Sequence, residues 1–323
     1  MREITMLEAI REALRNELQR DQSVFMMGEN IGPHGSVFKQ TLGFWEEFGD
    51  DRIRDTPISE SACVGAAIGA AICGMRPVID LMYLDFFPVA MDQIVNQAAK
   101  LKYMSGGQLR APIVLRSCFG AFKADGPHHS QSFYSWFIHT PGLKVVIPST
   151  PYDAKGLLIG AIRDNDPVIY LEHKALYKFK GLVPEEEYTI PLGKAEIKRK
   201  GEDVTTVATG FMVHKALEVA DEAANEGISV EVIDPRTLWP LDKETILRSV
   251  EKTGRFVIID EGYGPCGFGA EVASLVAEEA FDYLDAPIKR VYSHHVPIPF
   301  SPVMKDFVIP GKDRILEAVR SIT

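Results

Sequence analysis

The residues best placed to exchange protons in this sequence are one glutamate, Glu60, and a pair of histidines, His128-His129. Glu60 opens a run of small and apolar residues, where an ionised carboxylate costs several kcal/mol unless it is paired or protonated. One interpretation is a carboxylate that accepts hydrogen bonds from backbone amides at a helix start, where the helix dipole favours it. The other is a carboxyl with a raised pKa that exchanges a proton with a bound ligand.

The stretch around Glu60 predicts a helix. Pro57 disfavours helical geometry in the residue before it, and Ser59 is a suitable N-cap. The helix that follows is small and apolar all round, so we expect it to be buried, with Gly65 and Gly69 allowing another backbone to come close. A short apolar strand, 77–82, and the aromatic pair Phe86-Phe87 come next.

Composition excludes several classes of protein. The chain has 323 residues, enough for about two domains, with 46% hydrophobic and 25% charged residues, as in ordinary globular proteins. The net charge of −10 argues against nucleic acid or an anionic membrane as a partner. No apolar run is long enough to span a bilayer, residues 1–20 do not resemble a signal peptide, and the four cysteines show no C-x-x-C spacing. We expect a cytoplasmic protein.

Strands alternate with helices along both halves of the chain. In the first half, Thr5 and Glu8 form a capping box before an amphipathic helix. Strands are predicted near 23–28, 77–82, 112–117, 143–148 and 167–173, and helices near 88–105 and 150–166. This pattern favours a mostly parallel, doubly wound sheet.

A segment without helical period, 181–192, contains prolines and a run of glutamates and is interpreted as a linker. Strands and helices alternate again after it, which predicts a second, smaller doubly wound domain. The predicted domains are therefore 1–180 and 193–323.

In an open parallel sheet, ligands bind at the carboxyl ends of the strands. Glu60, Phe86 and the loop that holds His128-His129 are all predicted to lie there. A carboxyl, an aromatic face and an imidazole would suit a flat, nitrogen-rich heterocycle.

The sequence resembles the beta subunits of the thiamine-diphosphate-dependent 2-oxo acid dehydrogenase family. The resemblance runs from about residue 3 to the C-terminus and includes "DTPISE", "GMRPVIDL", "DQIVNQAAK", "YMSGGQ", "HHSQS" and "PGLKVVIPSTPYDAKGLL". It implies an α/β protein with a pyrimidine-binding doubly wound domain and a smaller transketolase C-terminal-like domain.

The resemblance also implies roles for individual residues. Glu60 matches the glutamate that hydrogen-bonds a pyrimidine nitrogen, which favours the imino form of the cofactor and so the thiazolium ylid. Phe86 matches the aromatic residue packed on the pyrimidine, and Ile58 and Met82 match pocket positions beside it. His129 matches the active-site histidine, which acts near the substrate carbonyl and in acyl transfer to a lipoyl arm, whereas His128 has no such match.

Metal and partner requirements follow from the same resemblance. A structural potassium site would use Ile113, Ala161, Asp164 and Asp166, largely through their backbone carbonyls. The alternative is a plain helix C-terminus whose carbonyls are hydrated by water. The Mg²⁺ that neutralises the diphosphate is held in this family by a "GDG" segment of the alpha subunit, and no "GDG" occurs here. We therefore expect half a cofactor site, an α2β2 heterotetramer with an alpha subunit, and a lipoyl-bearing acyltransferase core as acceptor.

Other interpretations stay open. The segment 262–267, "GYGPCG", formally fits a dinucleotide-binding loop, although Asp260 and Glu261 directly before it would repel a pyrophosphate. An assembly subunit without chemistry is a second alternative. His294-His295 could suggest a metal pair, but adjacent residues of a strand point to opposite faces.

The substrate is the least determined feature. "VIDPRTL" and "FVIIDEG" look most like acetoin-type beta subunits, whereas the other motifs are shared with pyruvate and branched-chain 2-oxo acid dehydrogenases. The predicted enzyme is an oxidoreductase that cleaves pyruvate-type 2-oxo acids or acetoin next to the carbonyl and transfers the acyl group to a lipoyl domain. A branched-chain enzyme is the alternative.

Overall fold

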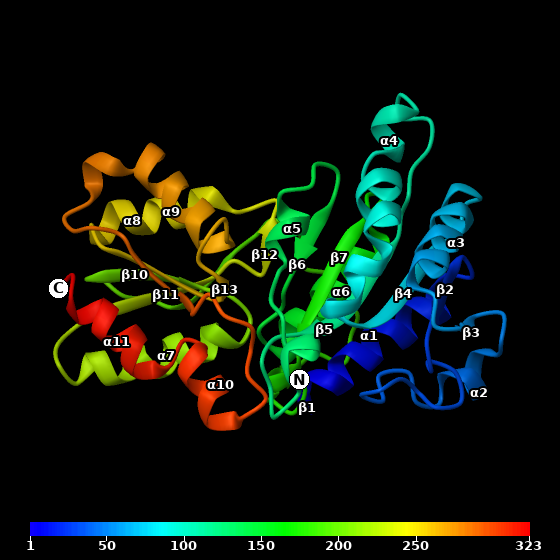
Figure 1. Ribbon diagram of the computed structural model, residues 1–323, viewed down its shortest axis with the longest axis horizontal. Helices are drawn as coiled ribbons and strands as arrows, with labels where there is room; N and C mark the ends of the chain where they lie inside the picture. Colours follow the sequence, from blue (N-terminus) through cyan, green and yellow to red (C-terminus); the bar gives the residue numbers. More distant parts are fainter. The chain divides into compact units, whose positions relative to one another are not determined.

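A computed structural model describes all residues, 1–323, and divides the chain into two compact units (Figure 1). The first unit comprises residues 1–119 and 136–192, and the second comprises residues 120–135 and 193–323. The segment 120–135, which carries His128-His129, therefore packs with the second unit although it follows a strand of the first. No helix combines the length and the hydropathy that crossing a membrane requires.

The first unit is built on six parallel strands in the order β6-β7-β5-β4-β2-β3. Its strands are β1 (Arg2–Thr5), β2 (Val24–Gly28), β3 (Ile53–Asp55), β4 (Arg76–Tyr83), β5 (Val114–Phe119), β6 (Lys144–Val146), β7 (Val168–His173) and β8 (Lys180–Val183). Every residue of β5 and β7 is buried, as expected for central parallel strands covered on both faces.

The helices of the first unit match most of the predicted ones. They are α1 (Met6–Arg20), α2 (Phe44–Phe48), α3 (Glu60–Ile72), α4 (Leu101–Met104), α5 (Ser135–Ile138) and α6 (Pro151–Arg163), with short turns η1 (Leu84–Ala90), η2 (Asp92–Ala98) and η4 (Lys174–Leu176). The Thr5–Glu8 capping box is present at α1, which packs on α6. The single helix predicted over 88–105 is instead a 3₁₀ turn, a π-helical turn and one α-helical turn.

The predicted linker is partly structured. β8 pairs with β1 in an antiparallel ladder, so the first residues after 180 continue the first unit. The fully buried Lys155 of α6 donates to the carbonyl oxygens of Pro184 (2.7 Å) and Glu186 (2.9 Å) and pairs with Glu12 (2.6 Å). A buried ammonium needs such oxygens around it, so this stretch is held against α6 and is not a free tether.

The second unit is a five-stranded sheet in the order β14-β13-β10-β11-β9. The strands of this sheet are β9 (Glu196–Arg199), β10 (Val204–Ala208), β11 (Val230–Asp234), β13 (Phe256–Tyr263) and β14 (Lys289–Ser293), and the short strand β12 (Thr237–Trp239) lies outside it. Its helices are α7 (Phe211–Ala224), α8 (Lys243–Thr253), α9 (Phe268–Glu279), α10 (Pro302–Val308) and α11 (Lys312–Arg320), with turns η3 (Pro127–His129) and η5 (Phe281–Tyr283). In Figure 1, α7 and α11 lie on one side of this sheet and α8 and α9 on the other.

The helix α3 corrects one expectation. It was predicted to be buried all round, but a stripe along it, Ala62, Ala66, Gly69 and Cys73, is exposed. One face packs against β4, η1 and η2, and within this chain nothing covers the other. Because all of its side chains are small, the sequence alone does not distinguish a core face from a face left open.

Candidate active site

The carboxyl ends of β2 and β4 and the start of α3 bring the candidate groups of the first unit together. Glu60 is the first residue of α3 and is only 9% exposed. Glu29 follows β2 directly and is also buried. Burial raises the pKa of Glu29, the neighbouring Glu60 carboxylate raises it further, and a hydrogen bond from the Ser59 backbone opposes both.

Glu29 explains how α3 begins. Ser59 was predicted to cap this helix with its hydroxyl, but its side chain makes no capping hydrogen bond. The carboxyl of Glu29, from a different element, interacts with the Ser59 backbone instead. Sequence analysis missed Glu29, although it stands at a strand's carboxyl end, where the rule used for Glu60 and Phe86 would have marked it.

The Glu60 carboxylate lacks a partner of its own. Among the described residues, no hydrogen bond or ion pair engages it, and the nearest charge that influences it is the like charge of Glu29. A carboxylate without a partner in the chain is available to accept a hydrogen bond from a ligand. The site therefore offers a hydrogen-bond acceptor at the start of α3.

The segment after β4 presents the aromatic residues. Phe87 is fully buried and packs on Phe137, with ring centroids 5.4 Å apart, so it belongs to the core. Phe86 is half-buried and meets Tyr83 edge-on at 5.6 Å. The Ser61 hydroxyl donates to the Val89 carbonyl (2.5 Å) and fixes α3 against η1, the turn that carries Phe86.

The two predicted pocket residues have unusual settings. Met82 adopts a left-handed conformation, φ +54°, which a side chain like methionine rarely takes. Its N–H donates to Asp80 Oδ1 (3.0 Å), and the register of β4 against β5 shifts between Asp80 and Tyr83. Ile58 is 83% exposed, so no part of this chain covers it.

A buried ion cluster holds Asp80 in place. Arg116 Nη1 lies 2.6 Å from the Asp80 carboxylate, and Arg116 Nη2 lies 2.7 Å from the Glu172 carboxylate. Tyr177 also donates to Glu172 (2.8 Å). Burial alone would lower the pKa of Arg116, but Glu172 and Asp80 raise it above its ordinary value, so the guanidinium stays charged. The cluster links β4, β5 and β7 beneath the turn at Met82.

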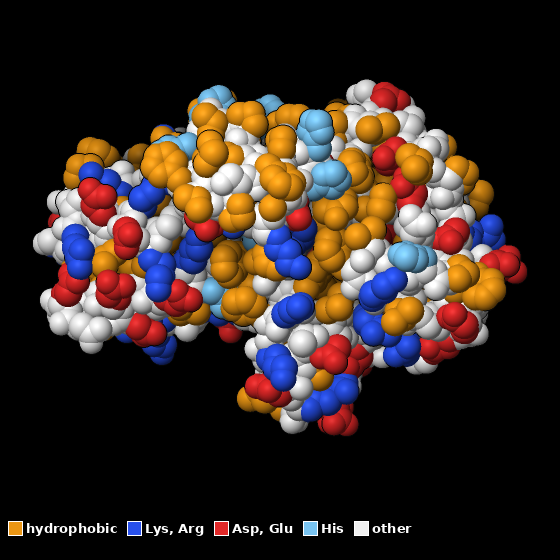
Figure 2. All heavy atoms as spheres, turned by 60° about the horizontal axis from the view of Figure 1, so that its bottom comes forward, with side chains coloured by type: hydrophobic (Ala, Val, Ile, Leu, Met, Phe, Trp, Pro, Cys, Tyr) orange, Lys and Arg blue, Asp and Glu red, His pale blue; other side chains and the backbone are white.

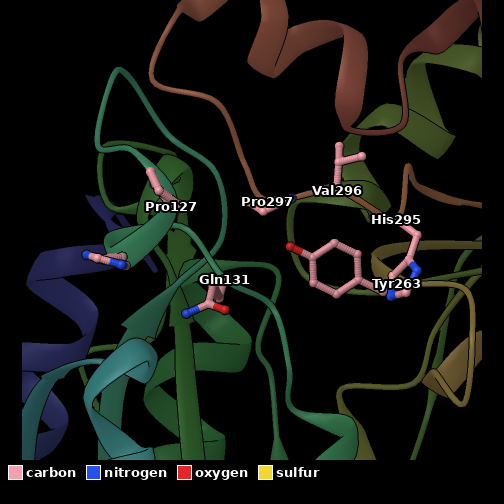
Figure 3. A pocket seen from close by; sticks show the side chains of 7 residues that line it. Pro127, Gln131, Tyr263, His295, Val296 and Pro297 are labelled. Carbon is pink, nitrogen blue, oxygen red and sulfur yellow. The ribbon is translucent and has the colours of Figure 1, made fainter.

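The histidine loop belongs to the second unit. His129 is half-buried in η3, and His128 is exposed and lines a pocket of about 480 Å³ with Gln131, Tyr263 and His295 (Figure 3). The Tyr263 phenol is directed toward the loop that carries Pro127 and Gln131. The structure thus gathers Glu60, Met82 and Phe86 with the first unit and His129 with the second.

The histidine pair near the C-terminus was expected on a strand, but β14 ends at Ser293 and both histidines follow it. The His294 ring stacks on Phe307, with centroids 5.1 Å apart, whereas His295 meets Tyr263 edge-on at 5.7 Å. The two imidazoles therefore contact different aromatic rings and do not form a joint metal site.

The segment 262–267 is filled by the protein's own groups. A Cβ on Gly264 would lie 2.3 Å from the Tyr292 ring, and a Cβ on Gly267 would lie 2.0 Å from the Tyr263 carbonyl oxygen. The N–H of Gly269, in the first turn of α9, donates to the Asp260 carboxylate (3.3 Å). A carboxylate already occupies the place that a pyrophosphate would take, so a dinucleotide does not fit.

The predicted potassium ligands are engaged elsewhere. Asp164 pairs with Lys144 (2.7 Å) and Asp166 with Lys102 (2.6 Å), while the Asp164 carbonyl accepts from Arg76. Lys102 and Lys144 lower the pKa of Asp166 although its burial opposes them. The carbonyl oxygens of Ile113 and Ala161 accept from the N–H groups of Val168 (3.0 Å) and Asp164 (3.2 Å), and the potassium site stays a prediction.

Family models match both units. The model described as "Transketolase, pyrimidine binding domain" matches residues 2–180, and "Transketolase, C-terminal domain" matches residues 193–315. The solved structure of a split-gene transketolase, described as an inactive beta4 tetramer, superposes with a TM-score of 0.81 over 99% of this chain and 98% of its own, at 22% identity. This likeness shows the fold.

Curated relatives match over nearly the whole chain. Identity is 50% with the acetoin:2,6-dichlorophenolindophenol oxidoreductase subunit beta of Cupriavidus necator (99% of this chain, 97% of the relative). It is 45% with the pyruvate dehydrogenase E1 component subunit beta of Bacillus subtilis (100% and 99%) and 43% with the 2-oxoisovalerate dehydrogenase subunit beta of the same organism (98% and 97%). The chain belongs to the family of transketolase-like beta subunits of pyruvate, acetoin and branched-chain 2-oxo acid dehydrogenases.

Proposed function

We propose that this chain is the beta subunit of a thiamine-diphosphate-dependent decarboxylating component that acts on a pyruvate-type 2-oxo acid or on acetoin. The observation that carries the proposal is the buried Glu60 carboxylate, which has no partner in the chain and stands beside Glu29, whose pKa is raised. When bound, thiamine diphosphate supplies an electron sink for cleaving the bond next to a carbonyl. The residues of this chain would bind and orient the pyrimidine half of the cofactor.

Glu60 holds a proton at a pyrimidine ring nitrogen. Its carboxylate has no partner in the chain and would accept the hydrogen bond of a protonated ring nitrogen, while burial and the charge of Glu60 raise the pKa of the neighbouring Glu29. Phe86 offers a half-buried ring against which a flat pyrimidine can pack, and Met82 shapes the turn that leads to it. His129 acts on the substrate side, near its carbonyl and during acyl transfer.

The complete enzyme requires a second kind of subunit. We propose an alpha subunit that holds Mg²⁺ and the diphosphate and completes a two-alpha, two-beta heterotetramer. The relatives' description as beta subunits supports this, as do the open face of α3 and the exposed Ile58. The acceptor would be the lipoyl group of an acyltransferase core, in the cytoplasm, where the four unpaired cysteines would stay reduced.

The experiment is reconstitution. The chain is assayed alone and with an alpha subunit from the same organism, with thiamine diphosphate and Mg²⁺, on pyruvate, acetoin and 2-oxoisovalerate. We expect turnover only in the complex, with pyruvate or acetoin preferred by kcat/KM. Preference for 2-oxoisovalerate would favour the branched-chain alternative. Rapid turnover by the chain alone would refute the prediction that it holds only half of the cofactor site.

A further inference from the structure

The loop that carries His129 is tied to the second unit by two adjacent carboxylates at the end of β13. The Ala121 N–H donates to Glu261 Oε1 (2.6 Å) and the Ser132 hydroxyl reaches the same oxygen (3.5 Å). The Tyr134 hydroxyl donates to the carboxylate of Asp260. The two acids therefore engage the loop near both of its ends, with the histidine between them.

A strand irregularity makes this double contact possible. Neighbouring side chains of a regular strand point to opposite faces, so Asp260 and Glu261 would normally diverge. Here the register of β13 against β14 shifts between Asp260 and Tyr263, where Asp260 pairs with Tyr292 and Tyr263 with Ser293. Such an irregularity re-aims a side chain, and both carboxylates reach the loop.

Both carboxylates are buried and well supplied with donors. Asp260 also accepts from the N–H groups of Gly262 (2.9 Å) and Gly269 (3.3 Å). The backbone of Glu261 is fixed in turn, because the Ser293 hydroxyl donates to its carbonyl (2.5 Å). The other charged group that faces Glu261 is Lys215 of α7, and the attraction of Glu261 partly offsets the lowering of the Lys215 pKa by burial.

Close packing also holds the loop at both of its ends. A Cβ on Gly262 would lie 3.1 Å from the Tyr134 hydroxyl and 3.2 Å from the Ser132 carbonyl oxygen, so a larger residue here would crowd the loop. At the other end of the loop, Ala121 is buried against Ile298, Val308 and Ile309. The stretch between these ends, with His128 and Gln131, walls the pocket opposite Tyr263 (Figure 3).

We propose that Glu261, with Asp260, is a positioning residue that holds the His129 loop in the shape required for turnover. The proposal rests on the proposed function for its catalytic consequence, whereas its structural part concerns the loop alone. A negative side chain is suited to this task because hydrogen bonds to a charged acceptor are stronger than neutral ones. Glu261 itself touches no reacting atom.

The test compares Glu261→Ala with Glu261→Gln, whose amide oxygen still accepts from the Ala121 N–H. Hydrogen exchange of peptides covering residues 120–133 is measured on the full chain and on the reconstituted complex. The loss of a hydrogen bond to a charged acceptor should raise the equilibrium constant for local opening of the loop about tenfold or more. The loop amides of Glu261→Ala should therefore exchange about tenfold faster than those of the parent. Glu261→Gln keeps a neutral acceptor, so its exchange should fall between that of the parent and that of Glu261→Ala.

The chain offers a matched control. Glu231 is a buried glutamate of β11 in the same sheet, and it pairs with Lys252 without contacting the loop. Glu231→Ala should leave exchange in 120–133 unchanged. In the complex, Glu261→Ala should lower kcat about tenfold without changing the Kd for thiamine diphosphate.

Unchanged exchange in Glu261→Ala, or equal acceleration in Glu231→Ala, would overturn the anchoring role. If Glu261→Ala does not fold, Tyr134→Phe takes its place, because it removes only the hydroxyl that reaches Asp260. This variant should also speed hydrogen exchange in residues 120–133. Faster loop exchange with kcat unchanged in an active complex would refute the catalytic consequence. An inactive parent complex would refute the proposed function. The exchange data would still show whether Glu261 holds the loop 120–133 in place.

Discussion

At the scale of single residues, the site depends on two carboxyl groups that meet at the start of α3. Glu60 is buried without a partner, and Glu29 reaches the Ser59 backbone from the end of β2. Either carboxylate alone could be an ordinary helix-end acid. Side by side, burial and the charge of Glu60 raise the pKa of Glu29, and a hydrogen-bond donor from a ligand would offset the repulsion between the two carboxylates.

Replacing Glu29 by glutamine should change how stability depends on pH. The pKa of Glu29 is raised in the folded chain, so its contribution to stability is present at low pH and is lost as pH rises through the folded value, above the usual 4.5. We expect Glu29→Gln to be more stable than the parent at neutral pH, with the gain vanishing near pH 4. Urea unfolding of the chain without cofactor at both pH values measures this. A gain that is equal at both would contradict the raised pKa.

The sequence was informative about Glu60 because a charged residue in an apolar run is a conflict visible without a structure. It was silent about Glu29, because the partnership depends on which strand ends beside α3. The predicted cap at Ser59 failed for the same reason, since a distant carboxyl took the place of the local hydroxyl. Local rules identified the unusual residue, and tertiary contacts supplied its neighbour.

At the scale of elements, three strands carry the same turn near their carboxyl ends. Asp80, Asp234 and Asp260 each accept, through Oδ1, the N–H of the residue two positions later. In two cases that residue, Met82 or Arg236, is held at positive φ. An aspartate that bonds the backbone two residues ahead is a common turn device. Asp234 ends β11, whereas Asp80 and Asp260 mark the register shifts within β4 and β13.

Arg116 should be critical to the first of these turns. Arg116→Met leaves Asp80 and Glu172 buried without their cation, which typically costs 3–5 kcal/mol, so the free energy of unfolding should fall by about that amount. The control is the triple variant Asp80→Asn, Arg116→Met, Glu172→Gln, which removes all the charges and should recover most of the loss. Denaturant unfolding decides, and a loss below about 1 kcal/mol for Arg116→Met would contradict the role.

Regular elements followed from sequence periodicity, but irregular ones did not. α1 and the buried strands were predicted because their apolar pattern matches one secondary structure. The breaks in η1 and η2 and the strand β8 inside the predicted linker are decided by tertiary contacts, such as Phe87 on Phe137 and Lys155 on the carbonyl of Pro184. No local signal marks those contacts.

At the scale of the whole molecule, each unit leaves large apolar side chains open. In the first unit Ile58 and Val89 are exposed, and in the second Phe300, Val303 and Phe307 are. Figure 2 shows hydrophobic side chains over a broad part of one face. Burying such surface against other subunits would remove it from water, which agrees with the proposed heterotetramer.

Cofactor affinity should therefore depend on assembly. The chain alone offers pyrimidine contacts but, in the proposed function, no Mg²⁺ or diphosphate site, so we expect its Kd for thiamine diphosphate to be at least about 100-fold weaker than that of the complex, or about 2.7 kcal/mol. Calorimetric titration of both, with Mg²⁺ present, measures the ratio. Equal affinities would show that this chain holds the complete cofactor site.

The most direct measurement concerns Glu60 itself. In the reconstituted complex, the exchange of the thiazolium C2 proton of bound thiamine diphosphate for deuterium reports activation before any substrate binds. Proton transfer by a positioned group is typically worth about 10²–10⁴-fold, so Glu60→Gln should slow this exchange at least about 100-fold while the cofactor remains bound. Exchange at the parent rate in a fully loaded Glu60→Gln complex would contradict the role given to this carboxyl.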